Sequence, residues 1–355
     1  MKKIKVAVLM GGKSPEYDVS LASGREIIGN LNPQKYEVLP VVISRDGQQW
    51  LIGQKARKLL FKKDQLISQT PPETRKVIGG QKTRQLVPLE QKLPPDVSKQ
   101  IDVVFIAMHG PYGEDGTIQG MLELAGLRYT GSHVLASALG MDKSMSRKIW
   151  QSQKIPVVPA FSLDKNDPHY SLFKNWSYPL VVKPFAQGSS VGVSIVHHKK
   201  ELPKALNLAF SYESKVIVEK YIKGMEITCG IIGNKDPRAL PIVEIIPKHE
   251  FFDYACKYTP GLSEEIVPAR IDKKTTARIQ EMAVAAYKAL GCQGFARVDG
   301  FLANDGNIYI SEINTIPGLT SVSLLPKEAK AIGISYPELL NKIINYALEK
   351  NLAQD

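Results

Sequence analysis

The sequence predicts an α/β protein of three domains, and three observations support this fold class. The 355 residues exceed the ~100 to 200 that are typical of one domain. Up to residue 131, apolar strand patterns alternate with helical patterns, which is typical of a parallel sheet covered by helices. Beyond that point, strand patterns follow one another through short turns, which predicts two α+β domains. We therefore expect domains at 1–131, 132–219 and 220–355, the last with an irregular polar loop at 249–263.

The N-terminal part shows the alternation most clearly. Residues 3–10 read "KIKVAVLM", an apolar run of the length of one buried strand, and a glycine-rich turn follows. Apolar positions then recur at helical spacing over 20–31, where Ser20 is expected to cap the helix. Further all-apolar strands are expected at 36–43 and 101–108, and a helix ended by glycine at 115–126.

Short strands predominate in the remaining two domains. The glycine-rich turn "FAQGSSVG" joins two of them in a hairpin-like arrangement, and "NDG" joins another two. Helices are expected at residues 141–153, 272–290 and 337–349. Strands are expected at residues 178–184, 191–196, 214–222, 225–232, 239–246, 294–303 and 307–314.

The formal net charge of +11 raises the question of nucleic-acid binding. Residues 45–99 hold 12 Lys and Arg against 5 Asp and Glu, so they carry seven of the eleven net charges. The two aromatic residues of this stretch, Trp50 and Phe61, both lie in its first third, too few to be interleaved with the lysines in the way that base stacking requires. We interpret this basic stretch as a solvated excursion and expect no nucleic-acid partner.

Cysteine usage and hydropathy place the protein in the cytoplasm. Cys229, Cys256 and Cys292 are widely spaced and form no CxxC pair, so neither a disulfide framework nor a zinc site is indicated. No apolar run approaches the ~18 residues that a membrane helix needs. The N-terminal apolar segment continues into "KSPEYD" instead of a small-residue cleavage site, so we interpret it as a strand and not a leader.

A charged pair within an otherwise apolar strand indicates a metal site. In "YISEIN", Glu312 and Asn314 are two residues apart and point to one face of the strand, while Ile313 points to the other. Asp299 and Arg297 belong to the preceding strand of the same hairpin. Two carboxylates and an amide offer hard oxygen ligands suited to Mg²⁺, which leaves its other positions to water and phosphate. The alternative is an ordinary half-exposed sheet face.

The stretch "VVKPFAQGSSVGVSI" is a candidate phosphate-binding hairpin. Its first strand carries Lys183, and its loop of small residues can expose backbone N–H groups to a phosphate. Lys143, in "MDKS", is a second candidate cation. A plain flexible hairpin remains the alternative for this stretch.

Two further segments fit a nucleotide site. In "VIVEKYIKGMEIT", backbone groups near Glu219 and Lys220 can read adenine while Glu226 holds a ribose hydroxyl, although an exposed charged turn explains the segment equally well. The loop "HEFFDYACKYTPGLSEE" carries Lys257 and has no periodicity, which is typical of a functional lid or of disorder.

Taken together, these residues resemble the ATP-grasp fold and, within it, the D-alanine:D-alanine ligase family. The resemblance covers nearly the whole chain and implies a Rossmann-like N-terminal sheet followed by two α+β domains that grip ATP. The basic excursion is the part it covers least well. The motifs that carry it are "GGKSPEYDVSL", "HGPYGEDGTIQGMLE", "YTGS", "SALGMDK", "VKPFAQGSSVG", "VEKYIKGMEIT", "GCQGFARVDGF" and "EINTIPGLTSVSL".

The resemblance also implies a role for each matching residue. ATP phosphates would contact Lys143, Lys183 and Lys257, and adenine and ribose would contact Glu219, Lys220, Ile222 and Glu226. Two Mg²⁺ ions, replaceable by Mn²⁺, would bind Asp299, Glu312 and Asn314. The first D-alanine would meet Glu16 with His109 nearby, the oxyanion would meet Arg297 and Gly318, and the second D-alanine would meet Ser323 and Leu324. A hydrogen-bonded network would join Glu16, Ser189 and Tyr258.

The implied reaction is the ATP-dependent joining of two D-alanines through a D-alanyl phosphate, for peptidoglycan precursors, in a homodimer. A tyrosine at position 258 accompanies dipeptide formation in the resembling ligases, so Tyr258→Phe is expected to raise ester synthesis with D-lactate. A D-serine acceptor stays open, as does a requirement for a monovalent cation. Residues 17 and 18 are Tyr-Asp where Arg-Glu is common, Phe252 replaces a frequent tyrosine, and "AQ" at 186–187 replaces a charged pair.

Two interpretations from other classes compete with a ligase. A noncatalytic nucleotide-binding protein of the same fold would be expected to lose Asp299, Glu312 or Arg297, and all three are present. Nucleic-acid binding through residues 45–99 would show as salt-dependent DNA retention that is lost when the stretch is deleted.

Overall fold

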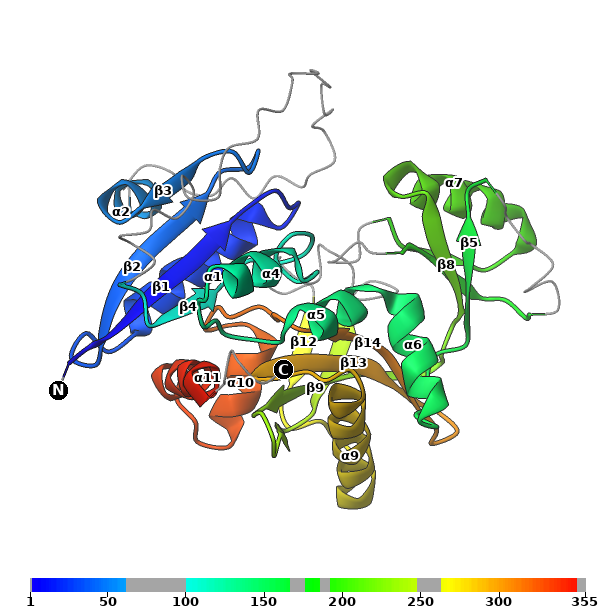
Figure 1. The fold of residues 1–355 in the computed structure, drawn as a ribbon. Coiled ribbons are helices and arrows are strands. Elements are labelled where there is room, and N and C mark those ends of the chain that lie inside the picture. Colours follow the sequence, from blue (N-terminus) through cyan, green and yellow to red (C-terminus); the bar gives the residue numbers. More distant parts are fainter. Residues whose placement is uncertain (1, 62–99, 167–175, 186–191, 248–262, 350–355) are drawn as a thin grey trace.

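The computed structural model of the chain describes residues 2–61, 100–166, 176–185, 192–247 and 263–349. Three β-sheets organise these residues, and Figure 1 shows them with their helices. The observed architecture confirms the predicted α/β class with a parallel N-terminal sheet.

The N-terminal sheet has the strand order β3-β2-β1-β4. β1 pairs in parallel with both β2 and β4, and β3 adds an antiparallel edge. The all-apolar runs are buried because helices cover the sheet, as a parallel sheet requires. The elements are β1 (Ile4–Gly11), α1 (Tyr17–Asn30), β2 (Tyr36–Ile43), β3 (Trp50–Ile52), α2 (Gln54–Leu60), β4 (Val103–Ile106) and α4 (Thr117–Leu124).

The prediction that Ser20 caps the first helix is wrong. The helix begins at Tyr17 with Glu16 at the N-cap position, so Ser20 lies inside it. The hydroxyl of Ser20 is fully buried, accepts from the Gly11 N–H at 2.7 Å and donates to the Ala107 carbonyl at 2.7 Å. Ser20 therefore ties α1 to the ends of two strands.

The second sheet has the order β5-β8-β6-β7, with antiparallel pairs throughout. The β6–β7 pair confirms the expected hairpin on either side of "FAQGSSVG". The elements are β5 (Ala160–Asp164), β6 (Leu180–Pro184), β7 (Ser194–Val196), the 3₁₀ turn η4 (Lys199–Glu201), α7 (Leu202–Tyr212) and β8 (Lys215–Lys220).

The third sheet has the order β12-β11-β9-β13-β14, with β10 attached to β9. The strand expected at 239–246 is split in two, because Pro241 has no N–H to donate to a ladder. The elements are β9 (Gly224–Ile232), β10 (Arg238–Ala239), β11 (Val243–Pro247), β12 (Ser263–Ile266), α9 (Lys273–Ala289), β13 (Phe295–Ala303), β14 (Ile308–Asn314), α10 (Leu324–Ala331) and α11 (Tyr336–Glu349).

The hydrophobic cores cross the predicted domain limits. Two helices before the second sheet, α5 (Val134–Met141) and α6 (Lys143–Ser152), contribute Ala136 and Trp150 to the core beneath β13 and β14. The last two helices, α10 and α11, return to the start of the chain and pack with the N-terminal strands, as Figure 1 shows. The boundaries at residues 131 and 219 stay predictions.

Candidate active site

A polar face on the third sheet brings the predicted metal residues together. In the β13–β14 register, Asp299 lies opposite Glu312 and Arg297 opposite Asn314. Ile313 is buried on the other face, as the period of two predicts. The amide of Asn314 donates to Asp299 Oδ2 at 2.8 Å. The hairpin therefore gathers two carboxylates, an amide and a guanidinium on one surface.

Arg297 and Asp299 form a two-contact ion pair. Arg297 Nε lies 2.8 Å from Asp299 Oδ1, and the terminal nitrogen lies 2.7 Å from Oδ2. Burial alone would lower the pKa of Arg297, but the charge of Asp299 outweighs it and raises that pKa. The buried hydroxyl of Thr228, on the neighbouring β9, also donates to Asp299. The guanidinium is fixed in orientation and permanently charged.

Helix α6 delivers Lys143 to this face and Arg147 to a neighbouring charge cluster. Asp142 caps it, accepting from the N–H groups of Ser144 at 3.0 Å and Met145 at 2.9 Å, and so sets Lys143 in the first turn. Lys143 Nζ lies 3.5 Å from Glu312 Oε2. Arg147 follows one turn later on the same side of the helix, and both side chains are buried.

Glu219 is the buried centre of a second charge cluster. It lies on β8, diagonal to Lys183 on β6, and its Oε1 is 2.8 Å from Lys183 Nζ. Arg147 contacts the same oxygen and also donates to the Ser311 carbonyl at 3.2 Å. Burial alone would raise the pKa of Glu219, but the charges of Arg147 and Lys183 lower it. Glu219 thereby holds Lys183, whose pKa is lowered by burial.

His109 forms a third cluster, with Glu16 and Glu114. Its Nδ1–H donates to the Ile316 carbonyl at 2.9 Å and lies 3.6 Å from Glu114 Oε1, and its Nε2 is 3.0 Å from Ser23 Oγ. Burial alone would lower the pKa of His109, but Glu114 and Glu16 outweigh burial and raise it. Because Ile316 follows Asn314 by two residues, His109 ties the N-terminal domain to the end of the β13–β14 hairpin.

The segment 315–323, here called the acceptor loop, joins β14 to α10. Ser323 is the N-cap of α10, and its Oγ accepts from the Thr320 N–H at 3.1 Å. A Cβ added at Gly318 would lie 3.0 Å from Ser323 Oγ, so Gly318 and Ser323 are close neighbours. Leu324 is buried against Val243 and Ile245.

The other predicted residues are placed as follows. Lys220 is the last residue of β8, and Ile222 lies in the short connection to β9. Glu226 is the third residue of β9. Lys220 Nζ is 5.6 Å from the centre of the Trp176 ring. Ser189, Lys257, Tyr258 and the loop 249–262 lie outside the described residues, so the predicted network of Glu16, Ser189 and Tyr258 stays a prediction.

Sequence reasoning missed several residues of these clusters. Arg147 follows Lys143 at the helical spacing of four, a signal that could have found it. Glu114 lies within the quoted motif "HGPYGEDGTIQGMLE". Glu328 carried no signal: it lies on α10, is fully buried, and approaches Gly230, where an added Cβ would meet Glu328 Oε2 at 2.1 Å.

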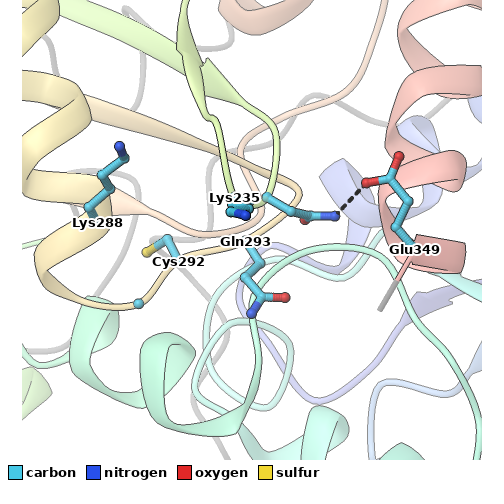
Figure 2. A pocket seen from close by; sticks show the side chains of 7 residues that line it. Lys235, Lys288, Cys292, Gln293 and Glu349 are labelled. Atoms are coloured by element: carbon cyan, nitrogen blue, oxygen red, sulfur yellow. Dashed lines mark hydrogen bonds between the residues drawn. The ribbon is translucent and has the colours of Figure 1, made fainter. Parts of the chain in front are cut away.

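A polar hollow of about 500 Å³ lies elsewhere, at the end of α9 (Figure 2). It is lined by Asn234, Lys235, Lys288, Gly291, Cys292, Gln293 and Glu349. Asn234 donates to Glu349 at 3.0 Å, which closes one side. None of the predicted site residues lines this hollow.

The donor chemistry of the hairpin fits Mg²⁺. Asp299 and Glu312 face each other and Asn314 adds an amide oxygen, all hard donors. Within the described ranges, no group of three or more His, Cys, Asp and Glu side chains is arranged so that it could hold a metal ion. The described helices also include none with the length and hydropathy of a membrane span.

Comparisons with known proteins agree along the whole chain. The profiles "D-ala D-ala ligase N-terminus" and "D-ala D-ala ligase C-terminus" match residues 5–132 and 149–345. The D-alanine–D-alanine ligase of Geobacillus thermodenitrificans is 39% identical, covering 98% of this chain and 96% of its own length. That of Pelotomaculum thermopropionicum is 37% identical, covering 98% and 97%.

Solved structures give the same result. The VanG D-Ala:D-Ser ligase of Enterococcus faecalis is 34% identical with a TM-score of 0.79, covering 98% of this chain and 100% of its own. The ATP complex of the Bacillus anthracis D-alanine–D-alanine ligase is 35% identical with a TM-score of 0.74, covering 97% of both chains. The three sheets, the polar hairpin and these matches over the full length together show that the chain belongs to the D-alanine–D-alanine ligase family.

Proposed function

We propose that the chain joins two D-alanines to D-alanyl-D-alanine through a D-alanyl phosphate, with release of ADP and phosphate from ATP, for peptidoglycan precursor synthesis. One observation carries the chemistry: Lys143, Lys183 and Arg297 converge with the carboxylates of Asp299 and Glu312 on neighbouring surfaces. A reaction that brings a triphosphate and an amino-acid carboxylate together needs such cations beside metal ligands. Family membership supplies the identity of the substrate.

The first step would move the γ-phosphoryl group of ATP onto a carboxylate oxygen of the first D-alanine. ADP leaves and a D-alanyl phosphate forms. Lys143 and Lys183 would neutralise phosphate charge, and the ion pair with Glu219 would keep the Lys183 ammonium in place. Asp299, Glu312 and Asn314 would hold Mg²⁺ or Mn²⁺, and the bound ions supply further charge neutralisation on the phosphates.

The second step would form the peptide bond. The amine of the second D-alanine attacks the acyl carbon, the amine loses a proton, and the carbon–oxygen bond to phosphate breaks. Negative charge develops on the carbonyl oxygen, which Arg297 and the backbone of Gly318 would stabilise. The two-contact pair with Asp299 holds the guanidinium in orientation beforehand, so little reorganisation is needed during reaction.

The substrate pockets would lie on either side of the hairpin. Glu16 would bind the ammonium group of the first D-alanine, with His109 nearby and Glu114 as a further carboxylate beside His109. Ser323 and Leu324 would hold the second D-alanine. Lys220, Ile222 and Glu226 would line the nucleotide side, and Lys257 with Tyr258 would belong to the lid that protects the acyl phosphate from water. We further propose a cytoplasmic homodimer.

The test is phosphate release by purified protein with ATP and Mg²⁺. D-alanine, L-alanine, D-serine, and D-alanine with D-lactate are compared, and the products are separated by chromatography. Dipeptide from D-alanine alone supports the proposal. ATP binding without phosphate release from any substrate would overturn it in favour of a noncatalytic nucleotide-binding protein.

A D-serine acceptor is the second candidate. The observation that favours it is the 34% identity to the VanG D-Ala:D-Ser ligase over 98% of this chain. A mixed D-alanyl-D-serine product that outcompetes D-alanyl-D-alanine at equal acceptor concentrations would establish this alternative.

A further inference from the structure

The acceptor loop is held from the N-terminal domain at two points. His109 donates to the carbonyl of Ile316 at 2.9 Å, near the start of the loop. Glu26 Oε2 accepts from the N–H of Ser321 at 2.5 Å, near its end. Glu26 lies 295 residues before Ser321 in the chain, so this contact forms only in the assembled molecule. Glu26 has no part in the catalytic role proposed above for Arg297 or in the proposed metal site on β13 and β14.

Both contacts depend on helix α1. Ser20, Ser23 and Glu26 follow one another at steps of three residues, so they form one row that winds along the helix. Ser20 contacts the backbone of Gly11 and Ala107, Ser23 contacts His109, and Glu26 contacts Ser321. Helix α1 therefore contacts the turn after β1, the His109 cluster and the acceptor loop, and it fixes their relative positions.

The contact of Glu26 falls where the loop turns into α10. Thr320 and Ser323 close this turn through the Ser323 N–H to Thr320 carbonyl bond of 2.9 Å, and Ser321 lies between them. Tyr336 donates to the Leu319 carbonyl from the opposite element, α11. Burial raises the pKa of Tyr336 and the charge of Glu26 adds to the rise, so Glu26 and Tyr336 act on the same turn.

We propose that Glu26 is a positioning residue for the acceptor amino acid. A hydrogen bond from a backbone N–H to a carboxylate is stronger than one between neutral groups, so Glu26 fixes the turn that presents Ser323 and Leu324. This inference rests on the proposed function, because it assigns the acceptor pocket to those two residues. It adds a residue of the N-terminal domain that touches neither substrate.

The experiment compares Glu26→Ala and Glu26→Gln in the full-length protein. Glu26→Ala removes the acceptor atom, whereas Glu26→Gln retains a neutral oxygen. The control is Glu37→Ala, which removes the same charge from an exposed position on β2. Circular dichroism melting of each variant shows whether the fold is retained.

Steady-state kinetics provide the first measurement. We expect Glu26→Ala to raise the KM for the second D-alanine about tenfold, the scale of one lost charge-assisted hydrogen bond. The KM for ATP and for the first D-alanine should change less than twofold, and Glu26→Gln, which keeps a neutral acceptor, should restore part of the acceptor KM. A uniform loss of kcat with an unchanged acceptor KM would overturn the proposal.

Hydrogen–deuterium exchange of peptides covering 315–324 provides the second measurement, and it needs no catalysis. The Ser321 amide should exchange faster in Glu26→Ala than in the wild type and in Glu37→Ala. If the wild type has no ligase activity but this amide is protected by Glu26, the proposed function fails while the contact stands. If exchange is unchanged, Glu26 does not hold the loop and the inference fails by itself.

Discussion

Arg297 and Asp299 lie two residues apart on β13, and the guanidinium contacts both carboxylate oxygens at 2.8 and 2.7 Å. The pair divides two proposed tasks between neighbours, since Asp299 would serve the metal ions and Arg297 the developing oxyanion. Because each side chain holds the other in orientation, we expect a substitution of either residue to impair both proposed tasks.

Replacing Arg297 by lysine tests the oxyanion role. Lysine keeps the charge but loses the two-contact geometry, so we expect kcat to fall by about 10² to 10³, the usual effect of one lost oxyanion donor. The KM for ATP should change little. Arg278→Lys, on the exposed side of α9, is the matched control. A kcat within threefold of the wild type would contradict the assignment.

Replacing Glu312 by glutamine tests the metal site. The change removes one of two facing carboxylates while keeping the side-chain shape, so Mn²⁺ affinity in the presence of ADP should fall at least about tenfold. Electron paramagnetic resonance of free Mn²⁺ measures this without turnover. Asp305→Asn, at the turn of the same hairpin, should leave Mn²⁺ binding unchanged. Equal affinity in both variants would place the metal elsewhere.

Replacing Glu219 by glutamine tests the buried charge cluster. The substitution leaves Arg147 and Lys183 buried without their shared carboxylate, so the free energy of unfolding should drop by about 3 to 5 kcal/mol. Urea denaturation measures the drop. Glu244→Gln makes the same substitution beside Arg270, which is largely exposed, and should cost about 1 kcal/mol. Similar losses in the two variants would mean that the buried cluster contributes no more to the free energy of unfolding than the pair of Glu244 with the largely exposed Arg270.

Glu328 makes stability depend on pH. Burial raises its pKa to about 8, although the charge of Arg297 opposes the rise. Between pH 5 and 8 the folded protein therefore holds a proton that the unfolded chain has released, so its stability falls as pH rises, by about 1.4 kcal/mol per pH unit at most. Above pH 8 this dependence ends.

Glu328→Gln should remove that dependence. Its free energy of unfolding relative to the wild type should rise steadily from pH 5 to pH 8 and then stay level, as measured by urea denaturation across the range. Glu338→Gln, on the exposed surface of α11, serves as the control. A difference that does not vary with pH would show that Glu328 is ionised in the folded state throughout.

The pairing of β13 with β14 could be predicted from sequence because its signals are local. The strand period of two fixes which side chains share a face, and the "NDG" turn fixes which strands pair. The role of Ser20 could not, because a capping position depends on where the helix begins, and Glu16 occupies that place. Glu328 needed knowledge that α10 covers Gly230, a contact between segments almost a hundred residues apart.

The same reason explains why the sequence could not show which core each helix joins. Local patterns predict helices that match α6 and α11 but not α5 or α10, and they do not show the sheet against which an apolar helix face packs. Trp150 donates to the Ala286 carbonyl at 3.0 Å, a contact that draws α6 to α9 and away from the second sheet. Only the tertiary structure decides such pairings.

The packing of α10 and α11 against the N-terminal strands also has a consequence for biosynthesis. Leu325, Leu339, Leu340, Ile343 and Ile344 complete a core whose strands leave the ribosome long before them. The nascent N-terminal sheet must therefore keep an apolar surface open until translation ends. A chain that terminates before α10 would lose this cover for good, so premature stops late in the message should yield aggregating fragments and not a partly active enzyme.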